Sequence, residues 1–148
     1  MAEITRKELI LAIADADKIR LAGVDLSNID LNRLDLANAN LRGANLRGTV
    51  LREALLGSAN MIGVAAVGCK LMFADLNLAV LIQADLTVAD LSGARLTGAN
   101  LSNANVSGAN LVNANLKGAN VSGIKFDAGT RWPDGRQGTG VNPVDYTR

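Results

Sequence analysis

The side chains that most often carry chemistry are scarce in this chain. The sequence contains no histidine and one cysteine, Cys69. Three acidic residues, Asp25, Asp30 and Asp35, follow one another at intervals of five. A lone cysteine without histidine forms neither an ordinary zinc site nor an internal disulfide. General acid–base chemistry would therefore fall to carboxylates or lysine. We expect no catalytic residues, no metal site and no cofactor, and so no enzyme.

The elements that position these side chains follow a period of five residues. Of the 22 positions spaced by five from 21 to 126, seventeen are leucine and the others are Met61, Ala66, Val106, Val121 and Phe126. The position two residues earlier is alanine in 14 repeats, and the position just before the leucine is Asp or Asn in 14. Two residues after the leucine, Gly occurs ten times and Asn four times. Neither an α-helix nor a β-strand has this period.

A chain with this period must turn a corner every five residues and point two side chains inward each time. Gly or Asn after the leucine tolerates the positive φ of tight turns. Four corners close a 20-residue coil, and stacking at about 4.8 Å predicts about 5.5 coils and a rod of about 26 Å. The clearest members of the predicted inward columns are Leu41, Leu46, Leu91, Leu96, Leu101, Ala94, Ala99 and Ala104.

This arrangement separates the few reactive groups. Asp25, Asp30 and Asp35 would lie on three different sides of the coil and could not form a close pair of carboxylates. Cys69 occupies an inward alanine position, where a buried thiol is inert. The interior itself is filled with leucine and alanine, which leaves no room for a substrate pocket.

The repeat Ala-(Asp/Asn)-Leu-x-x, seen in Ala99-Asn100-Leu101-Ser102-Asn103 and Ala114-Asn115-Leu116-Lys117-Gly118, resembles the pentapeptide-repeat family. The resemblance covers residues 19–126. It implies an all-β fold, a right-handed quadrilateral β-helix, and a protein that acts by binding other proteins. The tail from residue 130 is similar to one that follows the last coil in many cyanobacterial members of the family.

Residues 1–18 are predicted to form an N-terminal cap on this β-helix. Thr5 and Glu8 have the spacing of a capping box, with Thr5 as the N-cap. We predict a short helix over residues 5–17 that covers the first coil. Its apolar face would comprise Leu9, Ile10, Ile13 and Ala16. Binding of this helix to a membrane is the alternative, which the acidic residues at positions 8, 15 and 17 disfavour.

Residues 127–148 are predicted to form an irregular C-terminal tail that covers the last coil. In one interpretation Trp132 folds back over the end of the β-helix, and in the other it is an anchor for a partner protein. The glycines at 135, 138 and 140 follow no strand and precede no phosphate-loop lysine, so they do not predict a nucleotide site.

The outer surface is polar except in the third coil. Positions that should face water there are apolar, and contiguous exposed apolar residues on a soluble protein mark an interface. The candidate surface for a partner or for self-association is Ile62, Val67, Met72, Phe73, Val80 and Ile82, with Leu78 and Val88 beside it. A local distortion that turns some of these side chains inward is the alternative. The 20-residue stacking also predicts two charge pairs, Asp75 with Arg95 and Lys70 with Asp90.

Composition and charge narrow the function further. The net charge of +1 argues against nucleic-acid binding, and the longest apolar stretch, residues 54–73, contains the repeat and is not expected to span a membrane. The N-terminus has no secretory signal, so we expect a cytoplasmic protein.

The leading hypothesis is a non-catalytic module that binds another, unidentified protein or itself. The alternative is a DNA mimic that protects a topoisomerase such as gyrase, which the near-neutral charge disfavours.

Overall fold

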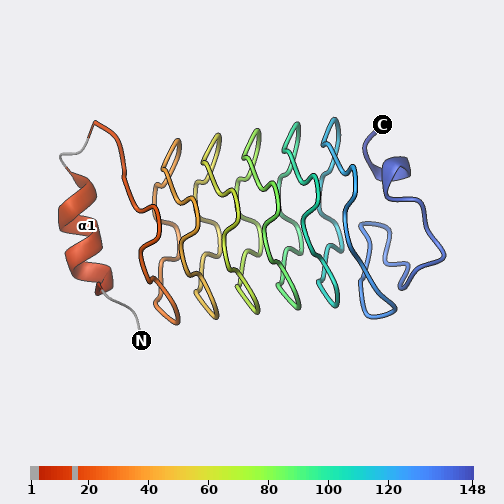
Figure 1. Cartoon of the computed structure of the whole chain (residues 1–148), viewed down its shortest axis with the longest axis horizontal. Coiled ribbons are helices and arrows are strands. Elements are labelled where there is room, and N and C mark those ends of the chain that lie inside the picture. The colour runs from red at the N-terminus through yellow and green to blue at the C-terminus, as the bar shows by residue number, and fades with distance from the viewer. Residues whose placement is uncertain (1–3, 15–16) are drawn as a thin grey trace.

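The chain forms a stack of coils with a different structure at each end (Figure 1). The computed structural model describes residues 4–14 and 17–148. Helix α1 (Arg6–Ala14) lies at the N-terminal end of the stack, and the short 3-10 helix η1 (Pro143–Tyr146) lies in the C-terminal segment. Neither of these described helices has the length and apolar character needed to cross a lipid bilayer.

Successive coils are joined by parallel bridges at a spacing of 20 residues. The bridges run without a break from Arg20↔Asn40 to Asn105↔Lys125. The N–H of Leu41, for example, donates to the carbonyl of Asn60 at 2.8 Å. Over the described residues each side of a coil contributes a single bridge residue and no extended strand, so the strand pieces have their minimum length. The result is a quadrilateral β-helix.

Each coil has four sides and four corners because one turn occurs every five residues. We name the sides after the outward bridge residues of one coil, which are Asn60, Ala65, Lys70 and Asp75. The two residues after each inward leucine form a corner. Met72 and Phe73, for example, lie at the corner between the Lys70 side and the Asp75 side.

The inward positions form a continuous apolar core. The eight leucine and alanine residues named above as inward columns are each at most 1% exposed. Burial of one leucine side chain contributes about 1.5–3 kcal/mol, so the stacked columns stabilise the fold along its whole length. Among the inward positions of residues 19–126 the polar exception is Thr49, whose buried hydroxyl donates to the carbonyl of Leu26 at 2.7 Å.

The preference for Asp or Asn at the bridge position has a local cause. All 14 such side chains accept a hydrogen bond from the backbone N–H two residues later, as Asp25 does from Ser27 at 2.9 Å. This bond closes an Asx turn and satisfies a donor that the corner would otherwise leave unpaired. The Asp or Asn of each repeat therefore stabilises the corner that follows it.

At two bridge positions that lack Asp or Asn, a side chain of the preceding coil accepts the hydrogen bond instead. Val50 and Arg95 stand where Asp or Asn is usual. The N–H of Arg52 then donates to Asn32 at 2.9 Å, and the N–H of Thr97 donates to Asn77 at 3.0 Å. The corner donor is thus satisfied even where the local side chain cannot accept.

Helix α1 closes the N-terminal end, and one arginine connects it to the first coil. The two terminal nitrogens of Arg6 donate to the carbonyls of Asp30 at 2.6 Å and Asn32 at 3.0 Å. In later coils the carbonyls at these positions accept from the backbone of the preceding coil. The guanidinium therefore takes the place of the backbone N–H donors that a preceding coil would supply. It covers an edge that would otherwise invite pairing with another chain.

The predicted capping box is present, but the helix is shorter than expected. Thr5 N–H donates to Glu8 at 2.8 Å, and Glu8 N–H donates to the Thr5 hydroxyl at 3.2 Å. The Thr5 hydroxyl also donates to the Glu8 carboxylate at 2.7 Å, and this bond is the largest cause that lowers the pKa of Glu8, followed by the bond from the Thr5 N–H. Ala16, which was predicted on the apolar face, lies outside the described residues. The prediction for Ile10 is wrong: it is 39% exposed, because Leu9 and Ile13 are the residues that pack on the coil.

The C-terminal segment continues the ladder after one added residue. Arg131 bridges to Asn110, and the N–H of Asn113 donates to the carbonyl of Pro133 at 2.9 Å. Trp132 thereby takes the inward position of a further repeat and is fully buried. Its ring stacks on Tyr146 at 5.6 Å and meets Phe126 edge-on at 5.1 Å. Trp132 is therefore part of the cap on the last coil and not an anchor for a partner.

Candidate protein-interaction surface

A band of outward apolar side chains encircles the middle of the stack. We call it the apolar belt, and it comprises Val50, Leu55, Ile62, Val67, Met72, Phe73, Leu78, Val80, Ile82 and Val88. The inward positions of the same coils are filled by their own residues, since Val64, Ala66, Cys69 and Leu71 are all fully buried. The belt side chains therefore point outward, and the alternative of a local distortion is wrong.

The belt residues differ in exposure. Of the six predicted candidates, Phe73 is exposed at 56%, whereas Ile62, Val67, Met72, Val80 and Ile82 are half-buried. Leu78 is 62% exposed and Val88 is 56% exposed. Leu55, which sequence reasoning missed, is 42% exposed. It precedes Leu56 in an apolar run, and its position before the inward leucine is the signal that identifies it as outward.

The most exposed part of the belt lies on the Asp75 side. Leu55 is the bridge residue that precedes Asp75 in the central column of this side, and Phe73 and Leu78 lie at its two corners. Asp75 forms the predicted ion pair with Arg95 at 2.9 Å. This side therefore combines three exposed apolar side chains with one charge pair. Lys70 and Asp90 are bridge partners, but the described residues show no ion pair between them; the Asp90 carboxylate accepts from the N–H and the hydroxyl of Ser92.

Three belt residues adopt a backbone conformation that does not suit them. Phe73, Leu78 and Val88 have φ values of 57°, 59° and 50°. Positive φ is favoured by Gly and Asn and is an outlier for bulky or β-branched residues. Strained residues of this kind occur at functional sites more often than elsewhere. The corner positions thus hold large apolar side chains at a conformational cost.

The belt also leaves backbone donors without an acceptor. Leu55, Ala65, Lys70 and Val80 replace Asp or Asn at the bridge position. Over the residues that the structure describes, no group accepts from the N–H two residues further on in these repeats, at positions 57, 67, 72 and 82. Each of these donors lies next to apolar side chains of the belt. A partner that covered the belt could supply carbonyl or side-chain oxygens to them.

Charged groups border the belt at one corner. Glu53 accepts from Arg33 at 2.9 Å and from Arg52 at 3.1 Å. These contacts lower the pKa of Glu53, with the hydrogen bond from Arg33 as the largest cause. The guanidinium carbon of Arg52 lies 5.9 Å from the centre of the Phe73 ring. The exposed ring is therefore oriented beside a cation, as in cation–π contacts at interfaces.

No arrangement of reactive side chains occurs within the described residues. Cys69 is buried, and burial raises the pKa of its thiol to about 12. Its sulfur donates to the carbonyl of Thr49 at 3.2 Å. Among the described residues no three His, Cys, Asp or Glu side chains lie close enough to hold a metal ion. The surface that the structure does build, the apolar belt, is suited to binding.

Sequence and structure comparisons place the coils among known repeats. The profile described as Pentapeptide repeats matches residues 19–57 and 89–127, with 8 copies of the repeat. Eight of the ten belt residues fall in the interval 58–88, which the profile leaves unmatched. No curated protein matches the chain in sequence. The belt is therefore the part of the stack in which the sequence departs from the family pattern.

Several solved structures are similar to this chain, and Rfr23, with a TM-score above 0.5, shows the same fold. Rfr23, a pentapeptide repeat protein from the cyanobacterium Cyanothece 51142, is 29% identical over 83% of this chain and 95% of its own, with a TM-score of 0.63. HetL from Nostoc sp. strain PCC 7120, which is involved in heterocyst differentiation regulation, is 25% identical over 90% and 99%, with a TM-score of 0.33. QnrB1, a plasmid-mediated fluoroquinolone resistance protein, is 19% identical over 84% and 83%, with a TM-score of 0.46.

Proposed function

Because the chain belongs to the pentapeptide-repeat family, whose right-handed quadrilateral β-helices are generally non-catalytic, we propose that it is a protein-interaction module. The site is the apolar belt, centred on the Asp75 side. The observation that carries this proposal is the outward placement of Leu55, Phe73 and Leu78 on one side of a rigid stack. A contiguous exposed apolar patch on a protein surface marks an interaction site.

Two further observations support the same surface. Stability alone would favour Gly or Asn at the corners, yet Phe73 and Leu78 stand there at positive φ. The N–H groups at positions 57, 67, 72 and 82, which have no acceptor among the described residues, lie around the same coils. A protein partner combines apolar side chains with oxygen acceptors, so it would satisfy both features at once.

The alternative of a DNA mimic has weaker support. The repeat region, residues 19–126, carries nine basic residues and seven acidic ones, whereas a mimic of duplex DNA needs acidic columns. Three of its acidic residues lie beside an arginine: Asp30 is 3.5 Å from Arg6, Glu53 is 2.9 Å from Arg33, and Asp75 is 2.9 Å from Arg95. These pairs reduce the negative potential that a topoisomerase would recognise.

The test removes the apolar surface without disturbing the corners. Asn occupies the same corner position at 28, 38, 103 and 113 with φ between 56° and 61°. The double variant Phe73→Asn/Leu78→Asn should therefore fold and be at least as stable as the wild type. Val144→Asn removes an exposed apolar side chain outside the belt, where Val144 is 47% exposed, and is the matched control.

The measurement is affinity capture from cell lysate followed by titration of the purified partner. We expect a protein that wild type and Val144→Asn retain and that the double variant loses. With that purified protein, the dissociation constant of the double variant should rise by at least about thirtyfold, as for interface hot spots. Equal affinity of the folded double variant would contradict the proposal, and so would recovery of the bait alone.

A further inference from the structure

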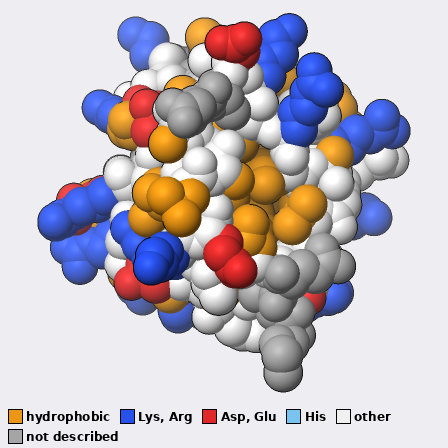
Figure 2. All heavy atoms as spheres, turned by 90° about the vertical axis from the view of Figure 1, so that its left-hand side faces the viewer, with side chains coloured by type: hydrophobic (Ala, Val, Ile, Leu, Met, Phe, Trp, Pro, Cys, Tyr) orange, Lys and Arg blue, Asp and Glu red, His pale blue; other side chains and the backbone are white. Residues whose placement is uncertain are grey.

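Helix α1 is apolar on two opposite faces, and only one of them is covered. Leu9 is fully buried against the first coil, and Ile13 packs beside it. On the outer face Leu11 is 67% exposed and Ile10 is 39% exposed. Figure 2 shows hydrophobic side chains gathered at this N-terminal end of the molecule. A helix that is apolar all round is normally buried on both sides.

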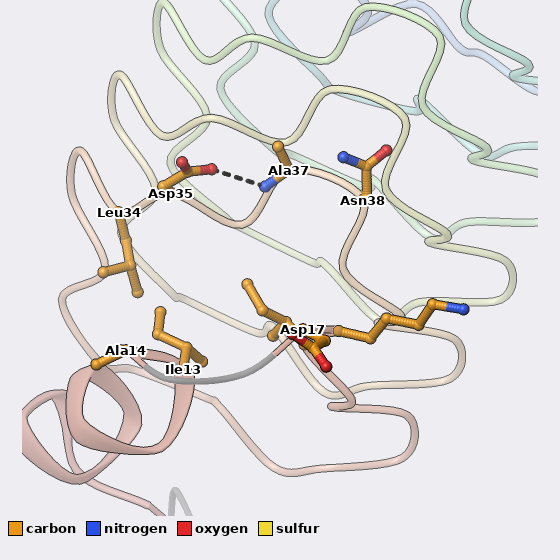
Figure 3. Close-up of a pocket in the computed structure, with 9 residues that line it drawn as sticks. Ile13, Ala14, Asp17, Leu34, Asp35, Ala37 and Asn38 are labelled. Carbon is orange, nitrogen blue, oxygen red and sulfur yellow. Dashed lines mark hydrogen bonds between the residues drawn. The ribbon is translucent and has the colours of Figure 1, made fainter.

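A hollow lies beside the last turn of this helix (Figure 3). Its volume is about 470 Å³, and its apolar lining includes Ile13, Ile19 and Leu34. Leu34 and Ile19 occupy inward columns, but they are half-buried because no coil precedes the first one. The N-terminal end of the stack therefore presents two adjacent features. One is the exposed Leu11 on the outer face of α1, which we call the ridge, and the other is the apolar hollow.

The charges around these two features are complementary. Lys7 lies one turn before Leu11 on the exposed side of the helix. Asp17, Asp35 and Lys18 line the hollow together with the apolar residues. Within the described part of the chain Lys7, Asp17 and Asp35 form no ion pair; Asp35 instead accepts from the N–H of Ala37 at 3.0 Å. The ridge thus carries an unpaired cation, and the rim of the hollow carries two unpaired carboxylates and one lysine.

We propose that two copies of the chain associate through their N-terminal ends in a two-fold symmetric dimer. Leu11 of each copy enters the hollow between Ile13, Ile19 and Leu34 of the other. Lys7 of each copy then reaches Asp17 or Asp35 on the rim. A two-fold interface requires a self-complementary surface, and a knob with a positive neighbour beside a hole with an acidic rim is one. The two helices run antiparallel across the axis, which also aligns their dipoles favourably.

This surface is separate from the apolar belt. The belt lies on the sides of the stack, whereas α1 covers its end (Figure 1). The dimer would therefore leave both belts accessible, and it would place two copies of the belt at a fixed separation. Loss of dimerisation and loss of partner binding can be distinguished, because different substitutions remove them.

The first experiment is sedimentation velocity over a concentration series with the full chain. We expect a reversible, concentration-dependent dimer for the wild type. Leu11→Asp should raise the dissociation constant by at least about a hundredfold, because each dimer buries two copies of this side chain. Val144→Asp, at an apolar residue of the opposite end that is 47% exposed, should leave the constant unchanged.

A charge exchange tests the geometry and does not depend on burial. Lys7→Asp and Asp17→Lys should each weaken the dimer, and the double variant Lys7→Asp/Asp17→Lys should restore it. Ala37→Phe fills the hollow from the coil side and should prevent entry of Leu11 while α1 stays in place. Circular dichroism of each variant checks that it folds.

Three results would overturn the proposal. A wild type that remains monomeric at high micromolar concentration would exclude it, and so would a dimer that survives Leu11→Asp. The third is flotation of monomeric wild type with vesicles of anionic phospholipid, abolished by Leu11→Asp. That result would show that the outer face of α1 binds a membrane surface.

Discussion

The ring of Phe73 lies against the backbone of Gly93, at the same corner one coil further along the stack. A Cβ atom at Gly93 would collide with ring atoms Cδ1 and Cε1 of Phe73. Leu78 is related in the same way to Gly98, where a Cβ would lie 2.8 Å from the leucine Cδ2. Large residues at the corners of the belt are thus accommodated by glycines in the next coil, and the belt could not be extended by one coil without steric conflict.

The first prediction follows from this contact. Gly93→Ala should lower the free energy of unfolding by more than Gly43→Ala, although the two glycines have nearly equal φ values of 66° and 65°. Gly43 has open space around its Cβ direction, so its substitution costs only the backbone term of about 1–2 kcal/mol. In a Phe73→Gly background Gly93→Ala should cost only that backbone value, because a glycine at the preceding corner leaves open space, as Gly23 does next to Gly43. Urea unfolding measures each variant, and equal losses at both glycines would refute the contact.

The second prediction concerns the hydrogen bonds that Arg6 donates to the first coil. Arg6→Ala should destabilise α1 against the first coil, because the carbonyls of Asp30 and Asn32 lose both donors. Arg6→Lys should restore little, since an ammonium group does not match two carbonyls as a planar guanidinium does. Arg42→Ala, at an exposed arginine on another corner, is the control. Hydrogen exchange of the first coil should accelerate in both Arg6 variants, and unchanged protection would contradict this role.

The third prediction concerns the C-terminal cap. Trp132→Ala should lower the free energy of unfolding by about 3–5 kcal/mol, the usual loss for a large buried aromatic side chain. Trp132 packs between Phe126 and Tyr146, and its indole N–H donates to the carbonyl of Gly138 at 3.0 Å. Trp132→Phe should lose less, because it keeps part of the packing. A loss below about 1 kcal/mol for the alanine variant, near the average for point mutations, would show that the tail does not stabilise the stack.

The fourth prediction is a dependence of stability on alkaline pH. Burial raises the pKa of the Cys69 thiol from 9.0 to about 12. The folded state therefore keeps a proton that the unfolded state loses, so the free energy of unfolding should fall as pH rises from about 9 to about 12. Cys69→Ala should remove this part of the pH dependence, as seen by comparing denaturant unfolding of both proteins over that range. Alkylation of native Cys69 at pH 9 should be slow and should become fast in denaturant.

Position in the repeat was sufficient to predict the path of the chain. The family and the quadrilateral fold inferred from the Leu and Ala columns are confirmed. The capping box of Thr5 and Glu8 and the pair of Asp75 with Arg95 also follow from spacing alone. In each case the interaction joins residues at a fixed separation of 3 or 20, so the distance along the sequence determines the distance in space.

The details of exposure were less predictable. Lys70 faces Asp90 in the ladder, yet the carboxylate of Asp90 accepts from Ser92 within its own corner. Ile10 belongs to the expected apolar face of the helix, but it is 39% exposed, because Leu9 and Ile13 are the residues that pack on the coil. Leu55 lies in the apolar stretch 54–73, yet its side chain points outward and is 42% exposed. Hydrogen bonds within a corner and the way a helix packs on the coil decide such cases.

The sequence by itself determined the period of five, and with it the inward columns, the corners and the 20-residue stacking, because every one of these features depends on local spacing. Only the tertiary structure decided how the two ends are closed. Arg6 supplies donors to carbonyls 24 and 26 residues away, and Trp132 enters an inward position after an insertion that breaks the period. These contacts have no repeating separation, and their geometry depends on how whole segments pack against the finished stack.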